Sequence, residues 1–121
     1  MSKIILVVED QEDNRRIMRD LLTSAGYEII EAVTGEEGVA AADTHRPDLI
    51  LMDIQLPGLD GYEATRQIKA NPELEHIPII VVTSYALSGD DVKAFEAGCN
   101  AYVSKPFSPR ELLAKIREYL Q

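Results

Sequence analysis

Three carboxylates, two hydroxyl groups and one lysine stand in this sequence close behind short apolar runs. Such positions fall at the ends of buried strands, where side chains from neighbouring strands of a sheet can meet. Three carboxylates brought together repel one another, and a hard divalent cation with oxygen ligands is the usual way to relieve the repulsion. The six residues are Glu9, Asp10, Asp53, Thr83, Ser84 and Lys105.

These side-chain types suit magnesium-dependent phosphoryl transfer. Mg²⁺ binds one or two carboxylates and leaves its other positions to water and phosphate oxygens. Lys105 supplies the fixed positive charge that a phosphate needs, and the hydroxyl of Thr83 supplies a hydrogen-bond donor. Asp53 is then placed to act as a nucleophile toward a phosphoryl group. Each residue alone also fits a simpler role as a helix cap, a strand end or a surface charge, so the interpretation depends on their joint placement.

Five apolar runs alternate with five amphipathic stretches, and these elements must position the six side chains. The runs are apolar throughout, as expected for strands buried on both faces. Strands are predicted over residues 4–8, 27–32, 47–53, 78–82 and 101–103, and helices over residues 13–25, 34–44, 61–70 and 88–97 and from residue 108 onward.

Capping signals mark the starts of the second to the fifth helix. Thr34 and Ser108 each open a capping box with a glutamate three residues later. Asp60 can cap the third helix, and Ser88 and Asp91 are the candidate caps of the fourth.

The alternation of strands and helices predicts a doubly wound, flavodoxin-like (βα)5 fold of the α/β class. Right-handed crossovers favour a parallel five-stranded sheet of order 2-1-3-4-5 with helices on both faces. Ligands of such sheets bind beyond the carboxyl ends of the strands, at the switch point between the first and third strands. Glu9 and Asp10 follow the first strand and Asp53 follows the third, so this fold brings the three carboxylates together.

Composition limits the partners and the setting of the protein. The 121 residues include 12 basic and 21 acidic side chains, for a net charge of −9. This charge opposes binding to nucleic acid and to anionic membranes. The length predicts one domain over residues 1–121, with no output domain, signal peptide or membrane span. The single cysteine, Cys99, fits a cytoplasmic location.

Four motifs stand at or just after the ends of predicted strands. They are Val7-Val8-Glu9-Asp10, Leu51-Met52-Asp53-Ile54-Gln55-Leu56-Pro57-Gly58-Leu59-Asp60-Gly61, Val82-Thr83-Ser84 and Lys105-Pro106-Phe107. They resemble the signatures of the response-regulator receiver domain, the CheY-like family, and the resemblance covers essentially the whole chain in the order, spacing and strand placement of the motifs. It implies a single-domain response regulator of two-component or phosphorelay signal transduction.

The resemblance implies that Asp53 accepts a phosphoryl group from a phosphohistidine, carried by a histidine kinase or a histidine phosphotransfer protein. Mg²⁺ would be the cofactor, bound by Asp10, Asp53 and the backbone carbonyl of Gln55. Glu9 would act through a metal-bound water.

The resemblance also implies a switch. Lys105 and Thr83 would contact the phosphoryl oxygens, and Tyr102 would swing inward when the Thr83 hydroxyl moves to the phosphate. Tyr102 fits ordinary half-buried strand packing as well. The Lys105-Pro106 bond resembles the cis-proline of the family.

Three positions resemble those that set the lifetime of the phosphorylated state. Ser84 leaves space beside the phosphate, and Gln55 and Tyr85 occupy positions that tune access of the hydrolytic water. Gln55 and Tyr85 are both larger than the smallest residues suited to these positions. Their size predicts intermediate-to-slow self-dephosphorylation.

The expected output is binding of a downstream target protein. The charge of the phosphoryl group would change the face formed by the fourth helix, the fifth strand and the last helix, with a coupling of about 1–3 kcal/mol. No nucleic-acid or membrane partner is expected. The protein is expected to be a monomer and not an independent enzyme, although it promotes its own phosphoryl transfer and dephosphorylation.

Three other interpretations fit parts of the sequence. A phosphohydrolase resembling the haloacid-dehalogenase family needs a second acid two residues after Asp53, where Gln55 cannot transfer a proton. A nucleotide or flavin binder needs a glycine-rich phosphate loop, and the acidic turn of residues 9–13 repels phosphate unless Mg²⁺ carries the contact. A receiver domain that folds without being phosphorylated is the third, although all the expected site residues are present.

Overall fold

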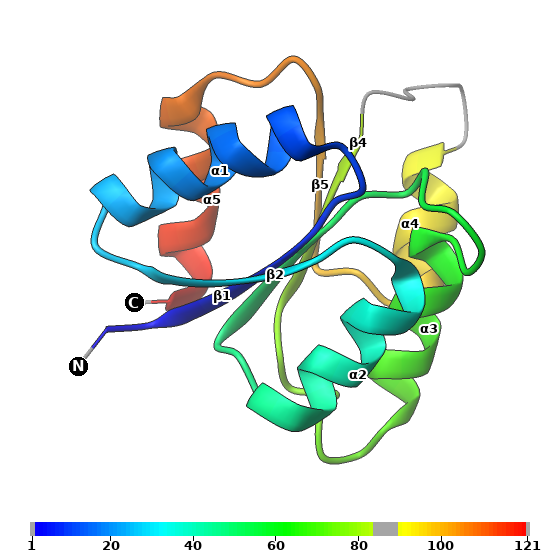
Figure 1. Cartoon of the computed structure of the whole chain (residues 1–121). Coiled ribbons are helices and arrows are strands. Elements are labelled where there is room, and N and C mark those ends of the chain that lie inside the picture. The colour runs from blue at the N-terminus through cyan, green and yellow to red at the C-terminus, as the bar shows by residue number, and fades with distance from the viewer. Residues whose placement is uncertain (1, 84–89, 121) are drawn as a thin grey trace.

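Five parallel strands form a sheet at the centre of the protein (Figure 1). The computed structural model describes residues 2–83 and 90–120. The strand order is β2-β1-β3-β4-β5, which confirms the predicted doubly wound, flavodoxin-like fold. The strands are β1 (Ile4–Val8), β2 (Glu28–Ala32), β3 (Leu49–Met52), β4 (Ile79–Thr83) and β5 (Ala101–Ser104).

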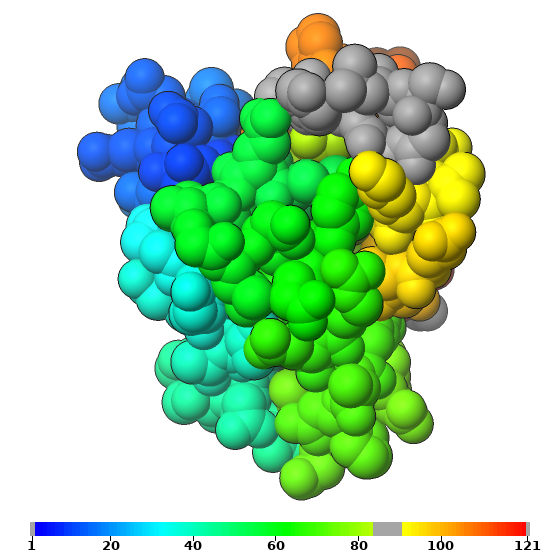
Figure 2. All heavy atoms as spheres, turned by 90° about the vertical axis from the view of Figure 1, so that its right-hand side faces the viewer, coloured from blue at the N-terminus to red at the C-terminus, as the bar shows by residue number. Residues whose placement is uncertain are grey.

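Helices cover both faces of the sheet. By the core residues that they bury, two of the described helices cover one face and three cover the other, as can be followed in Figure 1. Figure 2 looks onto the face with three helices, where the third helix (green) lies between the second (teal) and the fourth (yellow). No helix within residues 2–83 and 90–120 is both long enough and apolar enough to cross a membrane. The first face carries α1 (Glu12–Ser24) and α5 (Pro109–Leu120), and the second carries α2 (Gly35–His45), α3 (Gly61–Ala70) and α4 (Asp90–Ala97).

Alternate residues of the central strands enter two separate cores. On β1, Leu6 and Val8 belong to the core beneath α2, α3 and α4, whereas Ile5 and Val7 belong to the core beneath α1 and α5. Side chains alternate between the two faces of a strand, so a strand covered on both faces must be apolar at every position. This explains why the sequence shows continuous apolar runs at β1, β3 and β4.

Three of the predicted helix caps are confirmed. In each case the side-chain oxygen accepts a hydrogen bond from the backbone N–H three residues later, at 3.0 Å for Thr34, 2.9 Å for Asp60 and 3.0 Å for Ser108. α2, α3 and α5 begin at the residues that follow these caps. The other described element bounds agree with the predicted ones or differ from them by one or two residues.

The predicted start of the fourth helix needs one correction. Within the described residues α4 begins at Asp90, so Asp91 is its second residue and does not cap it. An acidic side chain in the first turn still suits the partial positive charge of a helix N-terminus, which is why its sequence signal resembles that of a cap. Ser88, the other candidate cap, lies outside the described residues.

Candidate functional site

Three carboxylates meet at the carboxyl ends of β1 and β3, which confirms the predicted cluster. The two strands are neighbours, with Val8 opposite Met52, so Glu9, Asp10 and Asp53 follow them at the same edge of the sheet. One oxygen of each carboxylate lies within 4.8 Å of the other two. Glu9 is 1% exposed and Asp53 is 8% exposed, so two of the three charges are largely removed from water.

Backbone contacts hold the loop that carries Asp53. Its N–H donates to the carbonyl of Val8 at 3.0 Å, and the Ile54 N–H donates to Oδ1 of Asp53 at 2.8 Å. Gly61, the first residue of α3, packs directly against this loop. A Cβ atom added at Gly61 would lie 2.0 Å from the carbonyl oxygen of Asp53, so this position requires glycine.

Lys105 brings positive charge to the cluster from the loop after β5. Its Nζ lies 2.5 Å from Oε1 of Glu9 and 4.0 Å from Oδ2 of Asp53. The Lys105–Pro106 peptide bond is cis, as the resemblance implied. The Lys105 N–H donates to the carbonyl of Thr83 at 2.7 Å, and Thr83 is fully buried at the end of β4. The backbone of Lys105 is therefore held beside the end of β4, where Thr83 lies, and of these two residues Lys105 lines the cavity over the carboxylates.

The charges of the cluster are unevenly compensated. The pKa of Asp53 is raised to about 7, first by burial and then by the negative charge of Glu9, with Lys105 acting in the opposite direction. Burial also acts to raise the pKa of Glu9, but the hydrogen bond and charge of Lys105 outweigh it and lower this pKa below its ordinary value. Lys105 thus compensates Glu9 far better than Asp53. Carboxylate oxygens at this spacing, with too little positive charge among them, fit a Mg²⁺ ion.

A polar cavity of about 390 Å³ opens over the cluster. Gln55 contributes to its wall from the turn after Asp53, while Gln11 and Asn14 contribute from the start of α1. Neither Gln11 nor Asn14 was expected from the sequence, although residues three apart at the start of a helix lie on one side of it. The lining consists of Glu9, Asp10, Gln11, Asn14, Asp53, Gln55 and Lys105.

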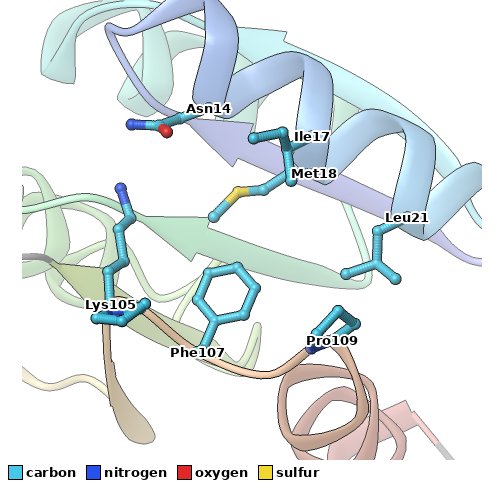
Figure 3. Close-up of a pocket in the computed structure, with 8 residues that line it drawn as sticks. Asn14, Ile17, Met18, Leu21, Lys105, Phe107 and Pro109 are labelled. Carbon is cyan, nitrogen blue, oxygen red and sulfur yellow. The ribbon is translucent and has the colours of Figure 1, made fainter.

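An apolar groove of about 530 Å³ adjoins the cavity, between α1 and the loop that joins β5 to α5 (Figure 3). Asn14 and Lys105 line both spaces, so the groove and the cavity are continuous at these residues. Figure 3 shows Met18 and Phe107 facing one another across the groove, with the amino group of Lys105 directed toward Asn14. Ile17, which also lines the groove, is 57% exposed.

Both residues expected to act as a switch, Thr83 and Tyr102, lie within the described structure, but two of the three expected to set the lifetime of the phosphorylated state do not. Tyr102 lies on β5 opposite Val81, half-buried against the core beneath α2, α3 and α4. This position is compatible with a switch and with ordinary strand packing. Ser84 and Tyr85 lie outside the described residues.

The chain is similar to known proteins over nearly its whole length. A family model described as the response regulator receiver domain matches residues 5–117. The polar-differentiation response regulator DivK of Brucella anthropi is 47% identical over 120 residues, which are 99% of this chain and 98% of that protein.

Two solved structures share the fold closely. The receiver domain of a sensor histidine kinase from Pseudomonas aeruginosa PAO1 has a TM-score of 0.93 and 39% identity, covering 99% of this chain and 98% of that one. It was solved with a magnesium ion coordinated in its active site cleft. A putative response regulator from Chloroflexus aurantiacus J-10-fl has a TM-score of 0.95 and 32% identity, with the same coverage of 99% and 98%.

Proposed function

The chain belongs to the response regulator receiver domain family and acts in two-component phosphorelay signalling, and we propose that Asp53 is the residue that accepts its phosphoryl group. A carboxylate oxygen of Asp53 attacks the phosphorus of a phosphohistidine, the phosphorus–nitrogen bond breaks, and the released histidine nitrogen keeps the electron pair and takes up a proton. The observation that carries the proposal is the Asp53 carboxylate itself, which is buried, poorly compensated and part of the cavity wall.

The carboxylates are proposed to hold Mg²⁺. Asp10, Asp53 and the backbone carbonyl of Gln55 would be the ligands, and Glu9 would act through a metal-bound water. When bound, Mg²⁺ supplies the positive charge that keeps Asp53 ionised and that binds a phosphate oxygen. The spacing of the three carboxylates and the magnesium ion in the similar Pseudomonas receiver domain support this assignment.

Lys105 and Thr83 are proposed to bind the phosphoryl oxygens. Because Nζ of Lys105 is 4.0 Å from Oδ2 of Asp53, a small movement away from Glu9 brings it to a phosphoryl group on Asp53. Its charge, and the Thr83 hydroxyl, would then stabilise the new negative charge. In the proposed switch Tyr102 follows Thr83 inward, while Ser84, Gln55 and Tyr85 set how quickly water removes the phosphoryl group.

Receiver domains of this family interact with histidine kinases or phosphotransfer proteins. We propose that the donor to this chain presents its phosphohistidine over the polar cavity and places apolar side chains in the adjoining groove, where Ile17 is exposed. The downstream target protein would bind the face of α4, β5 and α5. On α4, Val92 and Phe95 are 55% and 51% exposed, which gives this face apolar contact area.

We propose that residues 1–121 form one domain that acts as a monomer in the cytoplasm. Neither nucleic acid nor membrane is proposed as a partner. The chain would be a phosphoacceptor that promotes its own phosphoryl transfer and dephosphorylation, and not an independent enzyme. Gln55 supports this distinction, because an amide in the cavity wall cannot serve as the second acid of a phosphohydrolase.

Intact-mass spectrometry after incubation with a small acyl phosphate tests the proposal. Wild-type protein should gain one phosphoryl group in the presence of Mg²⁺ and none in its absence. Asp53→Asn should gain none. Asp60→Asn is the matched control, because it makes the same change in the same loop and asparagine caps a helix as well as aspartate. Uptake of the phosphoryl group by Asp53→Asn at the wild-type rate would refute the assignment.

A further inference from the structure

Arg15 on α1 holds the backbone of the acidic loop, and we propose that it is a positioning residue for the Mg²⁺ site. The inference rests on the proposed function of the three carboxylates. Nη1 of Arg15 donates to the carbonyl of Glu9 at 3.0 Å and to the carbonyl of Asp10 at 3.1 Å. Because both acceptors are backbone atoms, no side-chain pattern in the sequence indicates these contacts.

Both hydrogen bonds act on Asp10. The carbonyl of Glu9 belongs to the peptide unit before the Cα atom of Asp10, and the carbonyl of Asp10 belongs to the unit after it. Peptide units are planar, so holding both of them fixes φ and ψ of Asp10 and the direction in which its carboxylate leaves the chain. The carboxylate of Glu9 is held directly by Lys105 and by the Gln11 N–H. The carboxylate of Asp10 is instead oriented through its backbone, by Arg15.

Arg15 is itself anchored to the neighbouring strand. Its Nε lies 3.3 Å from Oε1 of Glu31 on β2, and its side chain is 16% exposed. Oε2 of Glu31 lies 3.3 Å from Nη1 of Arg19, one turn further along α1. In the sheet Glu31 is opposite Val7, so the anchor lies beside the end of β1 from which the acidic loop leaves. A planar guanidinium can bind the strand and the loop at once, which the single nitrogen of a lysine does less well.

The charge of Arg15 and its hydrogen bonds have opposite effects on a bound cation. The positive charge repels Mg²⁺, so removal of this charge alone would tighten Mg²⁺ binding. The hydrogen bonds orient a ligand, and loss of contacts behind a metal ligand typically weakens affinity by about 10- to 100-fold. The direction of the change therefore separates the two effects.

Isothermal titration of Mg²⁺ into the full chain tests the inference. We expect the dissociation constant of Arg15→Gln to be about tenfold higher than that of the wild type. Arg19→Gln is the matched control, because it removes the same charge and a contact to the same Glu31 without touching the acidic loop. We expect Arg19→Gln to change the dissociation constant by less than about twofold, as for an exposed ion pair.

A second variant keeps the positive charge at position 15 but lacks the planar guanidinium group. Arg15→Lys retains the repulsion of the cation but cannot reproduce both the two hydrogen bonds of the guanidinium to the loop and its ion pair with Glu31, so we expect its Mg²⁺ binding to be weaker than wild type. Urea denaturation of each variant establishes that it is folded under the conditions of the titration. If Arg15 served only to stabilise the fold, its replacement would lower the free energy of unfolding and leave the Mg²⁺ dissociation constant of the folded protein unchanged.

The outcomes distinguish this inference from the proposed function. Unchanged or tighter binding by Arg15→Gln, alongside a wild type that binds Mg²⁺, would overturn the inference and leave the proposed function standing. A wild type that binds no Mg²⁺ would overturn the proposed metal site and the inference with it. If Arg15→Gln does not fold, Arg15→Lys decides, and an unchanged dissociation constant there would also overturn the inference.

Discussion

Replacing Asp53 with asparagine is expected to stabilise the metal-free protein at neutral and alkaline pH. In the folded protein the pKa of Asp53 is raised from 3.8 to about 7, first by burial and then by the charge of Glu9. Folding is therefore less favourable whenever Asp53 must carry its charge. Asparagine keeps the shape of the side chain and an oxygen for the Ile54 N–H, which donates to Oδ1 at 2.8 Å.

The size of the effect follows from the two pKa values. Below pH 3.8 the carboxyl group of Asp53 is protonated in both the folded and the unfolded chain. The difference in stability between the wild type and Asp53→Asn should therefore not change with pH in this range. Between pH 3.8 and about 7 the unfolded chain has lost the proton that the folded chain retains, so wild-type stability falls as the pH rises. The loss is about 1.4 kcal/mol per pH unit, which accumulates to roughly 4 kcal/mol above the folded pKa.

Urea denaturation followed by circular dichroism, in the presence of a chelator, measures this difference. The stability gained by Asp53→Asn should be small near pH 4 and should grow to roughly 4 kcal/mol near pH 8. Saturating Mg²⁺ should narrow the gap, because it stabilises the ionised wild type and not the variant. Asp60→Asn controls for the removal of an exposed charge. A gain that does not vary with pH, or a variant less stable than wild type at alkaline pH, would refute the reasoning.

Substitutions at three further positions test local features of the fold. Gly61→Ala should lower the free energy of unfolding by at least about 2 kcal/mol, because its Cβ would lie 2.0 Å from the carbonyl oxygen of Asp53; a wild-type urea midpoint would contradict this. Thr65→Val should raise it by about 1 kcal/mol, because the buried Thr65 hydroxyl has no hydrogen-bond partner among the described residues; an unchanged or lower melting temperature would count against it. Thr34→Ala should lower it by about 1 kcal/mol through loss of the α2 cap, and Thr34→Asn should restore it; equal stability of the two variants would exclude a capping effect.

The fold could be predicted from the sequence because its strands and most helix starts have local signals. β1, β3 and β4 are apolar at nearly every position, since both of their faces are buried. Asp60 was identifiable as a cap because it is the polar residue that directly precedes its helix. The fourth helix offered two candidates, Ser88 and Asp91, and local sequence does not separate a cap from an acidic residue within the first turn.

The site could be predicted only where it depends on strand order. Glu9, Asp53 and Lys105 come together because the strands that precede them are placed by the topology of the sheet. The hydrogen bonds of Arg15 depend on the direction in which a helical side chain turns back to a loop, which the spacing of residues does not specify. The groove that includes Phe107 likewise depends on how α1 packs beside a loop that is distant in sequence.

The close approach of α3 to the loop after β3 also bears on how this domain can change during evolution. The atoms that exclude a side chain at Gly61 are backbone atoms of residues 53 and 54, and they remain whatever side chain stands at position 53. A descendant of this domain that had lost Asp53, and with it the phosphoryl chemistry, would still need Gly61 in order to fold. Among diverged homologues, glycine at position 61 would therefore indicate that the backbone structure is retained. Only the acidic residues would indicate that the phosphoryl chemistry is retained as well.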